Sequence, residues 1–353
     1  MIKHSQPTII NKRRLWNYFK EIINSAQFAE GRFVEDFEKK LCEFFNLKYA
    51  VCVSSGSVAL YTALLSLAVN EDSEVILPAY SCPALLNSVL QLRAKPVIVD
   101  VEIGDFNISY KEIKNHITNK TKAIIVPHMF GYPARDIKRI VDLGIPVIED
   151  TTHSIGAKVN GEMVGRFGKI NVISFYATKM ITTFGEGGVI LTNDKKIYEY
   201  IKDIKSYDKK TKFTLRYNFK LSEIQAAMGL IQLDNINKFI EKRKKIFEYY
   251  KNGFKNCSNI NIFEPLKHTE AVFYRFIIQL KNMNLNTLIR EYERFGIEVK
   301  KPVYLPLDKY YFKKFLCKKS QLLFNTTLSL PIYPSLKKEE VEYIIKITKK
   351  LIV

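Results

Sequence analysis

From residue 49 onward, short apolar runs alternate with longer stretches in which apolar positions recur at helical spacing. The short runs predict strands buried on both faces, and the longer stretches predict helices. Strands that alternate with helices predict a parallel sheet, in which ligands bind at the carboxyl ends of strands. Chemistry is therefore expected directly after each strand. The expected strands are 49–54, 74–77, 96–99, 123–126 and 147–149, and the expected helices are 58–69, 82–91 and 135–142.

The pattern changes near residue 240. Residues 237–250 are highly charged with helical spacing of apolar positions, which predicts a long helical connector. Beyond residue 257 the pattern predicts a smaller α/β unit that ends in an amphipathic helix over 337–351. We therefore expect a large domain over residues 1–240 and a small C-terminal domain over residues 241–353.

The composition is that of a globular protein with a substantial core. The longest apolar runs, such as 64–69, are far shorter than the roughly 20 residues that a bilayer span needs. Residues 1–16 lack the apolar segment of a secretory signal. The five cysteines are scattered without a C-x-x-C pair, so neither a zinc site nor a disulfide framework is expected. We expect a cytoplasmic protein that does not associate with membranes.

The formal net charge of +19 raises the question of nucleic-acid binding, because a basic surface attracts phosphate backbones. The lysines, however, are spread along the chain in pairs such as Lys313-Lys314 and Lys349-Lys350, and they do not form an arginine-rich stripe. We therefore expect no nucleic-acid partner. The excess charge is interpreted as solvated faces with some attraction for small anions.

A turn of small residues, Ser54-Ser55-Gly56-Ser57, separates an expected strand from an expected helix. Free N–H groups at a helix N-terminus can bind a phosphate, and a glycine there permits close approach. Helix capping alone is the commoner reason for such residues. The turn has neither the Gly-Lys-Ser/Thr of a Walker motif nor a G-x-G-x-x-G, so by itself it leaves both interpretations open.

Asp150, His153 and Lys179 are further candidates. Asp150 ends an expected strand, where a carboxylate could pair with the protonated nitrogen of a pyridine cofactor or could cap the next segment. His153 could contact that aspartate or the ring, or could simply be packed. Lys179 lies between an aromatic run and the glycine turn 185–188, a placement that partly desolvates the amine and favours imine chemistry. An ordinary surface lysine is the alternative.

Together these elements resemble, in order and spacing, the DegT/DnrJ/EryC1/StrS family of sugar aminotransferases. The similarity extends from the 31–37 region to 328–334 and so covers nearly the whole chain. It implies an α/β, three-layer, aspartate-aminotransferase-like fold of type I with a mostly parallel central sheet, and a homodimer with shared active sites. The motifs that carry it are SSGSVAL (54–60), PHMFG (127–131), IEDTTH (148–153), SFYATK (174–179) with GEGG (185–188), and YNFKLSEIQAA (217–227).

The resemblance implies pyridoxal 5'-phosphate as the cofactor and assigns roles to single residues. Lys179 would form the Schiff base with the cofactor, Asp150 would contact its pyridine nitrogen, and His153 would lie near its 3-hydroxyl. The residues implied to hold the phosphate are Ser55, Gly56, Ser57, Ser174 and, from the other subunit, Asn218.

Two positions depart from the family pattern. The family's stacking aromatic follows a Thr or Ser, and the corresponding residues here are Ser81 and Cys82. We expect Cys82 to pack against the cofactor ring, and Tyr80 to point elsewhere. The Asn that often follows the lysine is replaced by Met180, which removes one polar contact.

The implied reaction is a ping-pong transamination. L-Glutamate would convert the cofactor to pyridoxamine 5'-phosphate, which would aminate a nucleotide-linked keto-sugar, most commonly a 4-keto-6-deoxy hexose. Lys179 would move the proton between substrate and cofactor. One alternative is a dehydratase that uses pyridoxamine phosphate, in which histidine replaces the lysine. The other is a regulatory protein that holds cofactor without turnover, although the sequence shows no appended DNA-binding helix pair.

Overall fold

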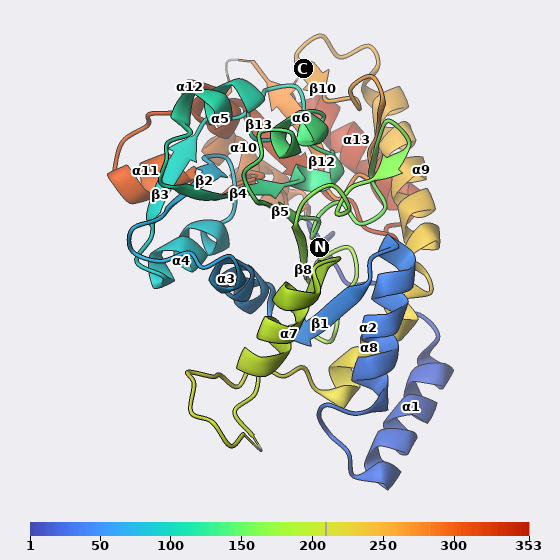
Figure 1. Cartoon of the computed structure of the whole chain (residues 1–353). Coiled ribbons are helices and arrows are strands. Elements are labelled where there is room, and N and C mark those ends of the chain that lie inside the picture. The colour runs from blue at the N-terminus through green and yellow to red at the C-terminus, as the bar shows by residue number, and fades with distance from the viewer. Residues whose placement is uncertain (209, 282, 353) are drawn as a thin grey trace.

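In a computed structural model, the chain is built around one central sheet with helices on both faces (Figure 1). The structure describes residues 1–208, 210–281 and 283–352. The strand order is β1-β9-β8-β5-β4-β2-β3. The strands are β1 Tyr49–Val53, β2 Glu74–Pro78, β3 Lys95–Val99, β4 Thr121–Pro127, β5 Val147–Asp150, β8 Ile170–Ser174 and β9 Gly188–Thr192.

The sheet is mostly parallel, as the sequence predicted. Strands β3, β2, β4, β5 and β8 run parallel to their neighbours, whereas β9 is antiparallel to both β8 and β1. The link from β8 to β9 contains no helix. Because a parallel return requires a crossover connection, usually a helix, the chain turns back antiparallel here. The strand expected over 49–54 is β1, which lies at the edge of the sheet, pairs antiparallel with β9 and so points in the same direction as β8.

The side chains of the sheet alternate between two hydrophobic clusters. In β4, Ile124 and Val126 join one cluster, while Ala123 and Ile125 join the other, because successive side chains point to opposite faces. The three layers follow from this alternation. One face is covered by α2 Arg32–Phe45, α5 Tyr110–His116, α6 Ile137–Val141 and α8 Glu223–Leu233, and the other by α3 Gly56–Ser66, α4 Pro83–Gln91 and α7 Lys195–Ile204.

A long helix, α9 Ile236–Phe254, joins this part to a C-terminal unit (Figure 1). Its Ile240 packs into the cluster of α2 and α8, and its Phe247 packs into a separate C-terminal cluster. That unit contains a sheet of order β10-β12-β13. Its elements are β10 Ile260–Ile262, β12 Phe276–Leu280, α10 Leu285–Arg294, α11 Leu307–Phe312, α12 Lys318–Thr326, β13 Thr327–Leu330 and α13 Lys338–Ile352. The expected division at residue 240 falls inside α9 and stays a prediction.

The smaller elements complete the chain. Helix α1 packs on α8, where Leu15 meets Met228 and Ile231. The remaining elements are α1 Lys12–Ser25, the 3-10 turn η1 Met129–Gly131, and the strands β6 Lys158–Val159, β7 Glu162–Met163 and β11 Thr269–Glu270 of a short separate sheet. Within the described residues, no helix is both long enough and apolar enough to cross a bilayer.

The N-terminal segment packs on the C-terminal unit. Ile2 pairs with Ile297 in a parallel bridge and lies against the C-terminal cluster. His4 is buried, and its Nε2 lies 2.9 Å from the Ser329 hydroxyl. The Thr8 hydroxyl donates to the Ser335 hydroxyl at 3.2 Å. Residues 2–8 therefore pack on the C-terminal unit, whose contacting residues begin almost 300 positions later in the sequence.

The 31–37 and 217–227 segments meet at the start of α2. The Glu223 carboxylate, buried at the first position of α8, accepts hydrogen bonds from the N–H groups of Gly31, Phe33 and Val34 at 2.8 to 3.1 Å. A carboxylate at a helix N-terminus satisfies free N–H groups and is favoured by the helix dipole. A side chain at Gly31 would place its Cβ 2.9 Å from Glu223 Oε2. These motif residues join α2 to α8.

Candidate active site

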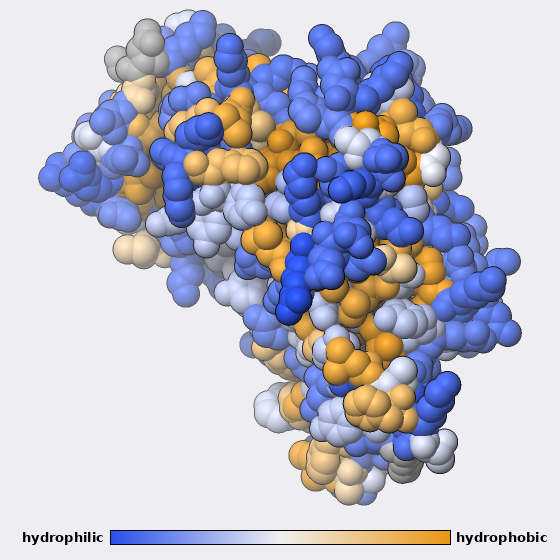
Figure 2. Space-filling model, turned by 60° about the vertical axis from the view of Figure 1, so that its left-hand side comes forward, coloured by the Kyte–Doolittle hydropathy of each residue, from blue (hydrophilic) through white to orange (hydrophobic). Residues whose placement is uncertain are grey.

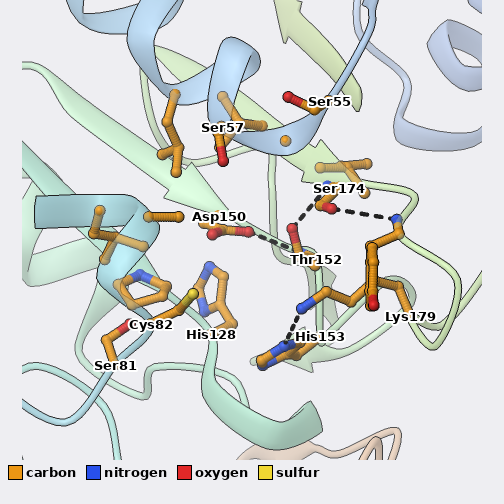
Figure 3. A pocket seen from close by; sticks show the side chains of 18 of the residues that line it. Ser55, Ser57, Ser81, Cys82, His128, Asp150, Thr152, His153, Ser174 and Lys179 are labelled. Carbon is orange, nitrogen blue, oxygen red and sulfur yellow. Dashed lines mark hydrogen bonds between the residues drawn. The ribbon is translucent and has the colours of Figure 1, made fainter. Parts of the chain in front are cut away.

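A cavity of about 380 Å³ opens at the carboxyl ends of the central strands (Figure 3). Pro127, Asp150 and Ser174, the last residues of β4, β5 and β8, all line it, which is the place where parallel sheets bind ligands. Nearly all the residues predicted from the sequence meet in this cavity. Those that line it are Ser55, Gly56, Ser57, Cys82, Asp150, His153, Ser174 and Lys179. Asn218 is absent from the described lining.

The N-terminus of α3 forms one end of the cavity. The Ser55 hydroxyl accepts the Val58 N–H at 3.2 Å, so this serine is a helix cap. A side chain at Gly56 would place its Cβ 2.4 Å from Ser174 Cβ, so only glycine allows the helix to start against the end of β8. Figure 3 shows Ser57 pointing into the cavity. The structure therefore shows that this turn caps the helix, and phosphate binding by the same turn stays a prediction.

Asp150 lies in the middle of the cavity wall in Figure 3. Its Oδ1 accepts the N–H of Thr152 at 2.9 Å, and the Thr152 hydroxyl in turn accepts the N–H of Ser174 at 2.8 Å. The His128 N–H donates to the backbone carbonyl of Asp150 at 3.0 Å. These bonds fix the carboxylate between α3 and Lys179, where it can interact with a cationic ring.

Lys179 is half-buried, and its amine contacts another predicted residue. Its Nζ lies 2.9 Å from His153 Nε2. Burial, together with the positive charges of Lys179 and Arg275, holds the pKa of His153 well below its usual range. The histidine is therefore neutral at physiological pH. The sequence suggested a contact with the aspartate or with a cofactor ring, whereas in the structure His153 contacts Lys179.

The positions that depart from the family pattern lie where the sequence suggested. Cys82 caps α4, is exposed, and lines the cavity beside His128 (Figure 3). Tyr80 is fully buried and points away, with its hydroxyl 2.9 Å from that of Thr327. Met180 is buried in the large-domain core and so offers no polar group to the cavity. One wall of the cavity thus presents a small thiol at the position where the family pattern has an aromatic side chain.

A buried His128–Glu149 pair, to which the sequence analysis assigned no role, supports this wall. His128 Nδ1 accepts the N–H of Ala134 at 3.0 Å, so the neutral ring carries its proton on Nε2 and donates it to Glu149 at 2.9 Å. The carboxylate has no exposed surface. The other donors to it, at 2.7 to 2.8 Å, are the backbone N–H groups of Gly165, Phe167 and Gly168.

Glu149→Gln is expected to lower the free energy of unfolding by about 3 kcal/mol, because the new amide NH₂ would face buried N–H donors. Urea denaturation measures this difference. Glu162→Gln, at an exposed position of β7, is the matched control and should change stability by less than about 0.5 kcal/mol. A loss below about 1 kcal/mol for Glu149→Gln would show that the carboxylate is not needed to hold this loop.

The sequence model of the DegT/DnrJ/EryC1/StrS aminotransferase family matches residues 10–349. The chain belongs to this family. GDP-perosamine synthase of Escherichia coli O157:H7 is 32% identical over 352 residues, which cover 96% of this chain and 95% of that protein. A pleiotropic regulatory protein of Geobacillus stearothermophilus is 30% identical over 350 residues, which cover 95% and 93%. The solved aminotransferase TlmJ of Streptoalloteichus hindustanus superposes with a TM-score of 0.93 at 24% identity, over 99% of this chain and 98% of that one.

Membership confirms the expected fold, an aminotransferase activity, and pyridoxal phosphate as the cofactor. The cavity also fits this cofactor. An amine, a carboxylate and a helix N-terminus surround one space (Figure 3), which matches the aldehyde, the pyridine nitrogen and the phosphate. The role of each residue toward the cofactor stays a prediction.

Proposed function

We propose that this protein transfers the amino group of L-glutamate to a nucleotide-linked keto-sugar, giving an amino sugar for a surface glycan or a related glycoconjugate. The observation that carries the proposal is that Lys179 and Asp150 face one cavity closed by the N-terminus of α3. Similarity to a GDP-perosamine synthase over 96% of the chain supports a nucleotide-linked sugar as the acceptor. A 4-keto-6-deoxy hexose is the proposed sugar.

Each predicted residue has a task in this proposal. When bound, pyridoxal phosphate withdraws electrons from the substrate and so makes its Cα proton removable. Lys179 would hold the cofactor through its amine, and the same amine would carry the proton that leaves Cα. Asp150 keeps the pyridine nitrogen protonated. The remaining contacts are Ser55, Gly56, Ser57 and Ser174 at the phosphate, His153 near the 3-hydroxyl, and Cys82 against the ring.

The first test is the response of the cofactor-loaded protein to glutamate. Absorbance should show conversion to the pyridoxamine form, and a panel of GDP-, UDP- and dTDP-linked keto-sugars should yield one aminated product by mass spectrometry. A spectrum that glutamate leaves unchanged would contradict the proposal and would favour the regulatory alternative. Loss of water from the sugar without gain of nitrogen would favour the dehydratase.

The proposal includes a homodimer with shared active sites. The connection between α7 and α8 extends away from the rest of the chain (Figure 1), and Figure 2 shows hydrophobic side chains gathered at that lower end of the molecule. Phe213 and Leu215 of the connection are 93% and 68% exposed, and Trp16 of α1 is exposed as well. Large exposed apolar patches are typical of interaction sites. Asn218 lies in this connection, five residues before α8, and is outside the described lining of its own chain's cavity.

Subunit mixing tests whether Asn218 acts across the dimer. Lys179→Ala and Asn218→Ala should each be inactive alone, yet an equal mixture should regain about one quarter of the normal activity. After random exchange about half of all dimers contain one subunit of each variant, and each of these dimers has one intact site of two. Glutamate-dependent amination after subunit exchange measures this recovery. No recovery after proven exchange would place Asn218 in the active site of its own subunit.

A further inference from the structure

The ring of His153 is stacked on the ring of Tyr274. The two centroids lie 4.2 Å apart, and the planes are 15° apart. The ring of Phe130 is nearly parallel to that of His153 as well, with its centroid 6.1 Å away. Stacking of this kind fixes the plane of the imidazole, and hence the direction in which its two nitrogens point.

The backbone of Phe130 selects the tautomer of that ring. Its N–H points at His153 Nδ1 with a distance of 3.5 Å, so Nδ1 is the acceptor and the neutral ring carries its proton on Nε2. Phe130 reaches this position with φ of 59°, a conformation that is rare for a bulky residue. The Arg275 N–H donates to its carbonyl at 3.0 Å and helps to hold that conformation.

Two arginines in turn hold Tyr274. The buried Arg243 of α9 donates to the carbonyls of Tyr274 and Ile332 at 3.1 and 2.9 Å. Arg275 places its guanidinium 4.6 Å from the centre of the Tyr274 ring, and donates to its hydroxyl at 3.4 Å. Burial alone would raise the pKa of Tyr274, but the charges of Arg275, Lys179 and Arg243 lower it. The tyrosine is therefore anchored to α9 and to the C-terminal unit.

We propose that Tyr274 is a positioning residue, which by stacking on His153 aims the Nε2 proton of that ring at the amine of Lys179. A hydrogen bond donated by His153 favours the neutral amine of Lys179, which has a free lone pair and is the form that attacks a carbonyl. In that attack the Nζ lone pair forms the C–N bond, and the carbonyl oxygen leaves as water with the two amine protons. The inference rests on the proposed function, in which Lys179 attaches to an aldehyde.

The other charged or titratable groups around Lys179 and His153 come from several elements. They remain unchanged in the variants below, so a change in pH dependence can be attributed to the stack. These groups are Cys82, His128, Asp150, Tyr176, Glu186, Arg243 and Arg275.

The test follows Schiff-base formation at Lys179 in the cofactor-free full chain. Pyridoxal, which lacks the phosphate, is added across a pH series, trapped with borohydride, and located by mass spectrometry. Tyr274→Phe keeps the stack and should match the wild type. Tyr274→Leu should move the half-maximal pH upward by about one unit, and so slow the reaction about tenfold at neutral pH. Nitrogen NMR of His153 should show one tautomer in the wild type and a mixture in Tyr274→Leu.

A second variant keeps the test decisive if Tyr274→Leu fails to fold. His153→Leu removes the N–H that is donated to Lys179 and should show the same upward shift of the half-maximal pH as loss of the stack. Wild-type pH profiles in both leucine variants would overturn the inference while leaving the proposed function intact. Absence of any trapped adduct at Lys179 in the wild type would overturn both.

Discussion

Lys179→Ala is expected to abolish transamination while the cavity keeps its ability to bind pyridoxamine phosphate. The substitution removes the amine that attaches to the cofactor and carries the proton, so kcat should fall by on the order of 10³-fold or more. Binding should survive because Asp150, Ser174 and the start of α3 are held by their own hydrogen bonds and packing. Glutamate-dependent amination and equilibrium binding of pyridoxamine phosphate measure the two effects separately.

The matched control for this variant is Lys196→Ala, at an exposed position of α7. It removes an equal charge from the surface and should leave kcat within about twofold. If Lys179→Ala retained normal turnover, the assignment of the amine would be wrong. If Lys179→Ala also failed to bind pyridoxamine phosphate, the lysine would be needed for the structure of the site and not only for the chemistry.

Asp150→Asn is expected to lower kcat by about 10² to 10³-fold, the usual loss when one preorganised electrostatic contact is removed. In the wild type, Oδ1 of Asp150 accepts the Thr152 N–H at 2.9 Å. The asparagine side chain keeps one oxygen that can accept the same hydrogen bond. The fold should therefore persist while the negative charge beside the ring nitrogen is lost. Steady-state kinetics with glutamate measure the loss, and thermal unfolding checks the fold.

Asp72→Asn, in the exposed turn before β2, is the control for Asp150→Asn. It removes the same charge far from the cavity and should leave both kcat and the unfolding temperature unchanged. A kcat within threefold of the wild type for Asp150→Asn would show that the carboxylate charge does not support the reaction.

It could be predicted that residues at strand ends would lie together in one site, because their positions depend on the geometry of the sheet. Parallel strands end at one edge, so Asp150, which follows an expected strand, was expected to lie where ligands bind. The strand that ends at Ser174 was not expected from the pattern, and Ser174 was assigned to the site through the family resemblance. Gly56 starts the helix that follows β1 and so reaches the same edge. Each residue alone had an ordinary explanation. Their shared position made the cofactor interpretation specific.

The contacts around His153 could not be predicted, because they depend on how distant segments dock. Tyr274 lies about a hundred residues further along the chain, in a segment held by Arg243 of α9. No local pattern of apolar and polar positions reports that approach. The positive φ of Phe130 is likewise a product of its surroundings, since a phenylalanine has no intrinsic preference for it.

Glu149 is a residue whose role the sequence did signal. A glutamate within the apolar run that forms β5 must be satisfied if it is buried, so it predicts partners that fold over the strand. Those partners are His128 and the 165–168 loop.

The pairing of Ile2 with Ile297 has a consequence for how the protein is made. On a ribosome that adds about 5 to 20 residues per second, the first strand-like segment waits roughly 15 to 60 seconds for its partner to emerge. The same delay applies to His4, whose Nδ1 lies 3.0 Å from the guanidinium of Arg275. The charged support of Tyr274 is therefore completed only after residues 275–332 have been made, so a nascent chain can assemble its central sheet, which ends with β9 at Thr192, well before its active site is finished.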